Sequence, residues 1–266
     1  MNRIDQRFAD LHAAGKKGFV AYIAAGDPSL ERTRDIVLAL EKCGVDVIEL
    51  GLPFSDPLAD GIVNQMAADR ALRAGATTVK ILAFIKELRN ETQIPLVLFT
   101  YLNPVYAYGF EAFHRDAAAA GADGALILDL PPDEAVRNDE LQKGEGLKRI
   151  RLIAPTTPEA RIPLITAQAE GFIYYVSREG VTGAQTSLST GIAAQVQRIK
   201  ATTEIPVAVG FGISTPEQAG AVAGMADAVV VGSAIVKLIE QHGSDAALAD
   251  KLTAFVKPLV DAVKAV

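Results

Sequence analysis

Eight short runs of almost wholly apolar residues recur along the chain, and each is followed by a segment whose apolar residues have helical spacing. The runs begin near Phe19, Val47, Pro95, Gly124, Arg149, Phe172, Pro206 and Ala228. Strands that are apolar throughout, rather than at alternate positions, are typical of parallel strands covered on both faces. Repeats of this kind without a Pro/Ser-rich linker predict an α/β fold, a single (β/α)8 TIM barrel formed by one domain over residues 1–266.

The first residues predict a helix that closes the bottom of this barrel, where the strands begin. Ile4, Phe8 and Leu11 are spaced i, i+4, i+7 and form one apolar face. The length of 266 residues agrees with the fold, which typically needs about 250. Further helices are predicted over residues 31–43, 133–143, 188–200, 216–223, 233–241 and 246–264.

Charge and hydropathy exclude several classes of function. The chain carries 26 Lys and Arg against 32 Asp and Glu, a formal net charge of −6, and its basic residues do not cluster. Binding to nucleic acid or to an acidic membrane surface depends on concentrated positive charge, so we expect neither. No stretch approaches the roughly 18 apolar residues of a membrane span, and the N-terminus lacks the apolar core of a signal peptide. We therefore expect a soluble, cytoplasmic protein.

Residues that bind metals or form disulfides are few. Cys43 is the only cysteine, and its helical surroundings predict a small buried side chain. His12, His114 and His242 lie away from the predicted C-terminal ends of the strands, and no His/carboxylate spacing resembles a metal site. We expect no catalytic metal.

Two intervals between strand starts are longer than the others. The second and third strands begin 48 residues apart, and the sixth and seventh 34 residues apart. Long connections in a compact domain serve mainly as lids or binding loops. Because the loops at the C-terminal ends of barrel strands build the active site, we expect it near the loops after strands 2 and 6.

Two carboxylates lie at the first of these loops. Glu49 stands in an otherwise apolar strand, where loss of hydration would raise its pKa and make it a general acid near neutral pH. The alternatives are a buried ion pair or a side chain that points to solvent. Asp60 follows in a polar loop, where it would stay ionised and accept a hydrogen bond from a substrate N–H. Its alternative is an aspartate that caps a turn or helix.

The end of the sixth strand predicts a loop that closes over a ligand. Tyr174 and Tyr175 precede a Gly-Val-Thr-Gly run in which Gly183 would present a backbone N–H and Thr182 would contact the Asp60 loop. An ordinary glycine-rich turn fits this run equally well.

Two glycine-rich turns at helix starts predict a phosphate site. Gly210–Ser214 follows strand 7, and Gly232 and Ser233 follow strand 8. Backbone N–H groups and the positive end of a helix bind phosphate without a lysine, which suits a chain of net charge −6. A phosphate site after strands 7 and 8 is a recurring use of this fold.

Taken in order, these segments resemble the tryptophan synthase α chain family over essentially the whole chain. The resemblance is carried by Glu49–Gly61, Ala25–Pro28, Ser177–Gly183, Gly210–Ser214 and Gly232–Lys237. It implies a lyase that cleaves indole-3-glycerol phosphate by a retro-aldol reaction to indole and glyceraldehyde 3-phosphate.

The resemblance also implies the roles of individual residues. Glu49 matches the general acid–base group and Asp60 the carboxylate that receives the indole N–H. The residues that match the substrate site are Tyr22, Phe99, Tyr101, Leu126, Tyr174, Thr182, Gly183, Phe211, Gly212, Gly232 and Ser233. Among these, the aromatic and aliphatic side chains would line a slot for the indole ring, although each is equally compatible with filling the barrel core.

The family implies a partner as well. Its α chain acts with a β chain that carries pyridoxal phosphate, two of each chain in the complex, and this chain itself would bind no cofactor. The chain departs from the family pattern at Ile62, where proline is common, at Asn64, where an aliphatic residue is common, and at Ala24, where threonine is common. Arg149 and Arg151 are unusually polar for a barrel strand, and their facing is open.

Two other functions remain open from the sequence. Another phosphosugar-processing barrel enzyme would share the phosphate motifs, but a Schiff-base aldolase needs a lysine on a barrel strand, and the eight predicted strands contain none. A regulatory subunit that senses its ligand without turnover is the non-catalytic alternative.

Overall fold

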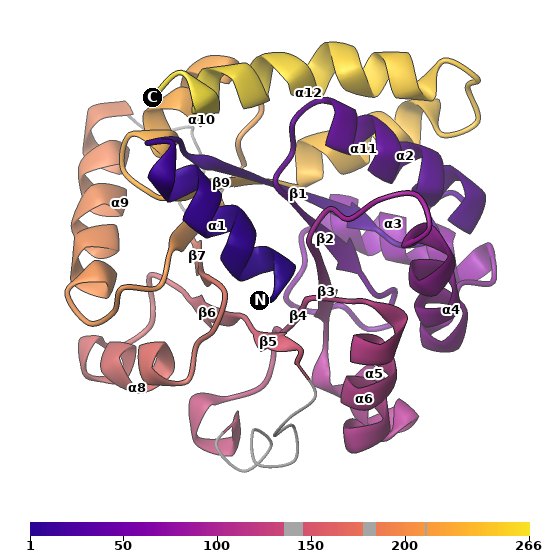
Figure 1. The fold of residues 1–266 in the computed structure, drawn as a ribbon, viewed down its shortest axis with the longest axis horizontal. Coiled ribbons are helices and arrows are strands. Elements are labelled where there is room, and N and C mark those ends of the chain that lie inside the picture. The colour runs from indigo at the N-terminus through magenta and orange to yellow at the C-terminus, as the bar shows by residue number, and fades with distance from the viewer. Residues whose placement is uncertain (136–145, 178–184, 211) are drawn as a thin grey trace.

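The computed structural model describes residues 1–135, 146–177, 185–210 and 212–266. Within them, parallel strands form one sheet in the order β5-β4-β3-β2-β1-β9-β8-β7-β6, with helices around it (Figure 1). The strands are β1 (Gly18–Ala24), β2 (Val47–Gly51), β3 (Leu96–Thr100), β4 (Gly124–Ile127), β5 (Lys148–Arg149), β6 (Arg151–Ile153), β7 (Ile173–Val176), β8 (Val207–Gly210) and β9 (Ala228–Val231). The predicted barrel is confirmed, and each of the eight predicted starts lies within one residue of the start of a strand.

The predicted fifth strand is divided in two at Ile150. β5 pairs with β4 and β6 pairs with β7, so the sheet reaches residue 150 from both sides and the barrel is nearly closed there. Ile150 and Leu152 pack inside the barrel, which turns Arg149 and Arg151 outward. The Nε of Arg149 donates to Glu170 at 3.0 Å.

One sequence expectation is wrong at this strand. β5 begins one residue earlier than predicted and therefore contains a lysine, Lys148. Its Nζ pairs with Asp5 of the N-terminal helix at 2.8 Å. This contact places the amine at the end of the barrel where the strands begin, opposite to the end at which a Schiff-base lysine would act.

The helices predicted at the N-terminus and over residues 31–43, 188–200, 216–223, 233–241 and 246–264 are present, with ends that differ by up to three residues, and further helices lie between them. The helices are α1 (Arg3–Ala13), α2 (Leu30–Lys42), α3 (Ile62–Arg73), α4 (Thr78–Leu88), α5 (Leu102–Tyr108), α6 (Phe110–Ala120), α8 (Ile162–Ala167), α9 (Gln185–Lys200), α10 (Pro216–Ala223), α11 (Ser233–His242) and α12 (Leu248–Lys264), with a 3-10 turn at Glu159–Arg161. The long interval between β2 and β3 contains two helices, α3 and α4, where a single strand–helix repeat has one. The helix predicted over 133–143 lies largely outside the described residues. No described helix is long and apolar enough to cross a membrane.

Side chains that alternate along the strands build two apolar layers. Ile48 and Leu50 of β2 point outward into the core between sheet and helices, where Cys43 is also buried. Val47 points inward, where it packs with residues from the other strands. Because side chains alternate, Glu49 also faces the barrel interior.

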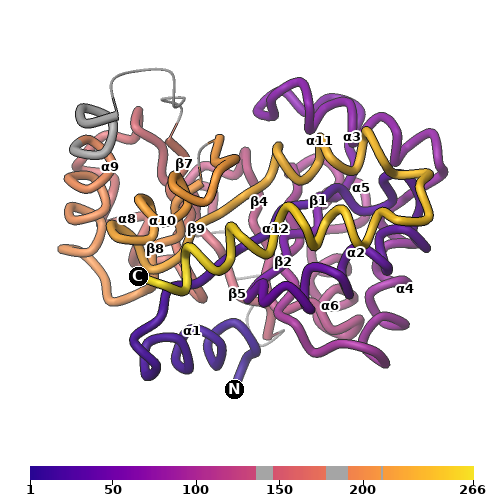
Figure 2. Tube along the Cα trace, turned by 90° about the horizontal axis from the view of Figure 1, so that it is seen from above, coloured from indigo at the N-terminus to yellow at the C-terminus, as the bar shows by residue number. Residues whose placement is uncertain are grey.

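The N-terminal helix closes the barrel at the end where the strands begin. Both views show α1 lying across this end, clear of the surrounding helices (Figures 1 and 2). Ile4, Phe8 and Leu11 are buried against the interior layer, and Phe8 packs on Phe172 with ring centroids 5.7 Å apart. The predicted helical closure of the bottom is confirmed.

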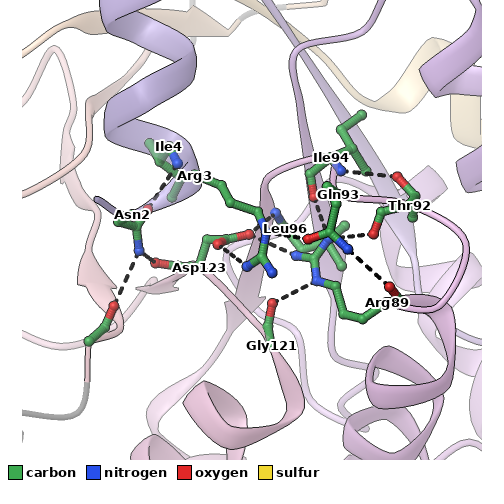
Figure 3. A network of polar contacts seen from close by, with 11 residues as sticks. Asn2, Arg3, Ile4, Arg89, Thr92, Gln93, Ile94, Leu96, Gly121 and Asp123 are labelled. Carbon is green, nitrogen blue, oxygen red and sulfur yellow. Dashed lines mark hydrogen bonds and ion pairs between the residues drawn. The ribbon is translucent and has the colours of Figure 1, made fainter.

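Asp123 ties this helix to the barrel. Its carboxylate accepts from Arg3 of α1 and from Arg89 after α4, each at 2.8 Å, and from the Leu96 N–H at 2.8 Å (Figure 3). Asn2 caps α1 and donates to the Asp123 carbonyl at 2.9 Å. A buried carboxylate thus bridges two cations and a strand.

The same arrangement recurs around the bottom rim. Asp46, Asp123 and Asp227 each stand directly before a strand and exchange two hydrogen bonds with the first or second residue of the previous strand. Glu170, three residues before β7, does the same with Arg149 of β5. The backbone N–H of the acid donates to that residue's carbonyl, and the carboxylate accepts its N–H. These pairs set the register of neighbouring strands at the end of the barrel away from Glu49.

Candidate active site

Glu49 lies inside the barrel with no hydrogen-bond partner among the residues that the structure describes. Its side chain is 0% exposed, and neither carboxyl oxygen accepts or donates a hydrogen bond. Burial without a compensating charge disfavours the ionised form and raises the pKa of Glu49 to about 8. The carboxyl group is therefore protonated and able to donate a proton at neutral pH.

An aromatic row crosses the interior beside Glu49. Phe99 of β3 lies between Tyr22 of β1 and Tyr174 of β7, with ring centroids 5.0 Å and 6.4 Å away. Burial, together with the negative charges of Asp60 and Glu49, raises the pKa of both tyrosines well above its usual value. Both hydroxyls are therefore neutral. Because the charges of Asp60 and Glu49 both act on these hydroxyls, the two rings lie close to both carboxyl groups.

Two glycines make room for the tyrosine hydroxyls. A Cβ at Gly51 would lie 2.4 Å from the hydroxyl of Tyr22, and one at Gly210 would lie 2.6 Å from the hydroxyl of Tyr174. Any side chain at either position would displace the ring. The last residues of β2 and β8 thus shape the interior.

Asp60 is held at the rim by Tyr101. The Tyr101 hydroxyl donates to the Asp60 carboxylate at 2.8 Å and accepts from the Ala59 N–H at 3.0 Å. Partial burial raises the pKa of Asp60 above its usual value, and hydrogen bonds from Tyr101 and Asn64 oppose that rise without cancelling it. Asp60 is thus an acceptor held in place by Tyr101, which contributes its hydroxyl as well as its ring.

Helix α3 is anchored to both sides of the site. Arg70 binds both carboxylate oxygens of Asp27, in the loop after β1, at 2.9 and 2.8 Å, and Glu240 of α11 at 2.8 Å. Sequence reasoning missed this residue. The partners are 43 and 170 residues away in the sequence, so no local motif marks them.

The two helix starts after β8 and β9 differ. At α10, Thr215 caps the Gln218 N–H, and Gln218 accepts from the N–H groups of Ser214 and Thr215. At α11, the N-cap is Gly232, and no side chain in the described part of the chain caps the helix. The first N–H groups of α11 are therefore available to an anion, whereas part of the α10 set is already bonded.

The other predicted site residues occupy distinct places. Leu126 lies deep in the interior layer, and Tyr175, next to Tyr174, faces the outer helices. Gly212 has a φ of +43° and is exposed, as is Ser233. Thr182, Gly183 and Phe211 lie outside the described residues.

A separate cleft of about 910 Å³ opens at the bottom, between α1 and the starts of β7 and β8. Two ion pairs lie among the side chains that line it, Asp5 with Lys148 and Asp227 with Lys200. It lies at the opposite end of the barrel from Asp60. Among the described residues, no group of three or more His, Cys, Asp or Glu side chains is arranged to hold a metal ion.

Residues 8–264 match the family model described as Tryptophan synthase alpha chain. The chain belongs to this family. It is 50% identical over 266 residues to the tryptophan synthase alpha chain of Geotalea uraniireducens, covering 100% of this chain and 99% of that one. The alpha chain of Geobacter sp. (strain M21) is 48% identical over 99% of this chain and 98% of its own.

Solved structures of the tryptophan synthase alpha chain family have the same fold. Tryptophan synthase subunit alpha from Legionella pneumophila superposes with a TM-score of 0.92 at 38% identity, covering 100% of both chains. A chain from tryptophan synthase of M. tuberculosis in its aminoacrylate-bound form superposes with a TM-score of 0.87 at 32% identity, covering 99% of this chain and 100% of that one.

Proposed function

We propose that Glu49 is the proton-transfer group in the cleavage of indole-3-glycerol phosphate to indole and glyceraldehyde 3-phosphate, the lyase reaction of an alpha chain in tryptophan biosynthesis. Protonated Glu49 donates its proton to C3 of the indole ring as the bond to the glycerol chain breaks. The resulting carboxylate takes the proton of the glycerol hydroxyl as the aldehyde forms. The proton is returned, so that the reaction needs neither a metal ion nor a cofactor on this chain.

Asp60 and the aromatic row bind the indole ring in this proposal. Protonation at C3 places positive charge on the ring nitrogen, and an ionised carboxylate that accepts the N–H stabilises it. Tyr22, Phe99 and Tyr174 offer flat apolar faces around Glu49. Two carboxyl groups with different surroundings thus take different roles, one as acid and one as anion.

The phosphate binds at the start of α11 in the same proposal. Gly232 and Ser233 present uncapped N–H groups there, and Gly212 lies in the loop after β8. Tyr22 spans the two ends of the site. A Cβ added at Gly232 would lie 3.3 Å from the Tyr22 Cβ, and the Tyr22 hydroxyl lies against Gly51. Thr182, Gly183 and Phe211 are proposed to complete the closed site.

The observation that carries this function is the buried, unpaired carboxyl of Glu49 at a pKa of about 8. Purified chain mixed with indole-3-glycerol phosphate should release indole, and Glu49→Gln should lower the rate by about 10² to 10⁴-fold. Glu91→Gln is the matched control, since Glu91 is a partly exposed acid paired with Arg34. Near-normal turnover by Glu49→Gln would refute the role.

We propose the β-chain contact at the rim around Asp60. The tryptophan synthase alpha chain family acts with a β chain, and large apolar side chains are exposed at this end: Leu58 (90%), Ile62 (69%), Met66 (45%) and Tyr106 (53%). Ile62 is one of the departures from the family pattern. We expect Leu58→Asp with Ile62→Asp to abolish co-purification with the β chain while indole release by the isolated chain persists.

The proposal also covers the composition of the complex, the place of its cofactor and its compartment. The complex would contain two of each chain, pyridoxal phosphate would lie on the β chain, and the protein would act in the cytoplasm without nucleic acid. Mass measurement of the purified complex and its pyridoxal phosphate absorbance in each separated chain test the first two. A complex with the mass of only one chain of each kind, or pyridoxal phosphate absorbance on this chain, would contradict them.

A further inference from the structure

Asn64 presents an unused hydrogen-bond acceptor next to Asp60. It lies in the first turn of α3, where its Nδ2 approaches Asp60 Oδ1 at 3.5 Å, and its Oδ1 is buried without a partner. The reverse orientation of the amide would place its oxygen against the carboxylate, acceptor against acceptor, which is unfavourable. Asn64 therefore directs its oxygen away from Asp60.

A buried acceptor without a partner costs free energy, so its presence needs an explanation. In the described part of the chain, five buried side-chain atoms have no hydrogen-bond partner, and three of them belong to Glu49 and Asn64. The two oxygens of Glu49 are accounted for by its proposed proton transfer. The cleavage of an unsubstituted indole ring makes no use of Asn64 Oδ1.

We propose that Asn64 widens the substrate range to indole rings that carry a second hydrogen-bond donor, a hydroxyl or amino group on the benzo ring. This inference rests on the proposed function, in which Asp60 receives the ring N–H. Asn64 Nδ2 lies 3.5 Å from Asp60 Oδ1, so the Asn64 oxygen is a second acceptor on the far side of that contact. The donor position that matches is 7, because that ring carbon neighbours the carbon bonded to nitrogen.

The resemblance predicts an aliphatic side chain at this position, which would offer no acceptor. A hydroxyl or amino group placed against an aliphatic wall would lose its hydrogen bonds to water without replacement. A methyl group would suit that wall instead. The identity of residue 64 therefore determines which of two isosteric rings is preferred.

The test uses the reverse reaction, in which C3 of the ring attacks the aldehyde carbon of glyceraldehyde 3-phosphate. The new C–C bond forms, C3 loses a proton and the former carbonyl oxygen gains one, so nothing is oxidised or reduced. We would measure kcat/KM for 7-hydroxyindole, 7-aminoindole and 7-methylindole with the unaltered chain and with Asn64→Leu. The ratio of donor ring to methyl ring should fall about tenfold in Asn64→Leu, the effect of one buried hydrogen bond.

Comparison of the two ratios cancels the intrinsic reactivity of the rings. Leucine is a stronger helix former than asparagine, so Asn64→Leu should keep α3 folded. Gln65→Leu is the matched control, because it also removes an amide from the first turn of α3. The Gln65 amide donates to the Asp60 carbonyl at 2.8 Å, and its loss should change kcat/KM for all three rings by the same factor.

An unchanged ratio in Asn64→Leu would overturn the inference, as would an equal fall in Gln65→Leu. Unsubstituted indole is run alongside. Failure of that ring to condense with any of the proteins would contradict the proposed function itself. Turnover of unsubstituted indole without discrimination among the substituted rings would contradict only the role of Asn64.

Discussion

The hydroxyl of Tyr101 donates to the Asp60 carboxylate at 2.8 Å and accepts from the Ala59 N–H at 3.0 Å. A single side chain at the junction of β3 and α5 therefore orients the carboxylate and the loop that carries it. The hydrogen bond from Tyr101 lowers the pKa of Asp60 against the effect of burial. Asp60 is the group that must be ionised in the proposed reaction.

Tyr101→Phe should shift the acid limb of the pH–rate profile. Removal of the hydrogen bond raises the pKa of Asp60, so ionisation and activity appear only at higher pH. We expect turnover at neutral pH to fall about tenfold, with partial recovery as the pH is raised. Measurement of kcat between pH 5 and 9 tests this. An acid limb at the same pH in both proteins would show that Tyr101 does not control the pKa of Asp60.

Glu49 should set the alkaline limit of activity. It acts as an acid, so activity should be present below its pKa of about 8 and decline above it. In Glu49→Asp, which retains a titrating carboxyl, the limb should persist at reduced rate. A profile of the unaltered chain that stays flat from pH 7 to 10 would contradict this assignment.

Glu49 should also destabilise the fold as the pH rises. Its pKa is about 8 in the folded chain and near 4.5 when unfolded, so between these values the folded state holds the additional proton. The free energy of unfolding therefore loses a contribution as pH rises through this window. Glu49→Gln should be more stable than the unaltered chain by a few kcal/mol at pH 9 and nearly equal at pH 4.5. Urea unfolding at both pH values measures the difference; a constant difference would contradict the buried titration.

Asp123→Ala should lower the free energy of unfolding by about 3 to 5 kcal/mol, because it leaves the largely buried Arg89 without its anion. It also removes the contact to Arg3, one of those that hold α1 on the barrel. Asp133→Ala is the control, since Asp133 pairs with Arg161 at the exposed surface and should contribute within about 1 kcal/mol. Equal effects of the two substitutions in urea unfolding would show that the Asp123 network contributes little.

Gly210→Ala should impair catalysis by displacing Tyr174, whose hydroxyl would lie 2.6 Å from the new Cβ. We expect the free energy of unfolding to fall by about 1–3 kcal/mol, as is typical of overpacking, and kcat to fall at least about tenfold. Tyr174→Phe in the same chain should restore part of the stability. Gly191→Ala, at an exposed helical position with nothing within 4 Å, should be neutral or stabilising.

Much of the fold followed from short-range patterns. Apolar strand runs and helical spacing depend on residues a few positions apart, so the sequence predicts the starts of the eight strand runs to within one residue. The exceptions arose at the fifth strand, where Ile150 interrupts pairing and Lys148 joins β5. Neither the interruption nor the extra residue changes the apolar pattern, so both escaped prediction.

Candidate residues could be named from the sequence, but their partners could not. The sequence by itself determined an apolar strand interrupted by Glu49 and a loop that carries Asp60, because these are features of neighbouring residues. Only the tertiary structure decided that Glu49 is unpaired, that Tyr101 holds Asp60, and that Asn64 Oδ1 has no partner. The physical reason is that solvation and hydrogen bonding in the barrel depend on side chains contributed by strands far apart in the chain, which meet only when the sheet closes.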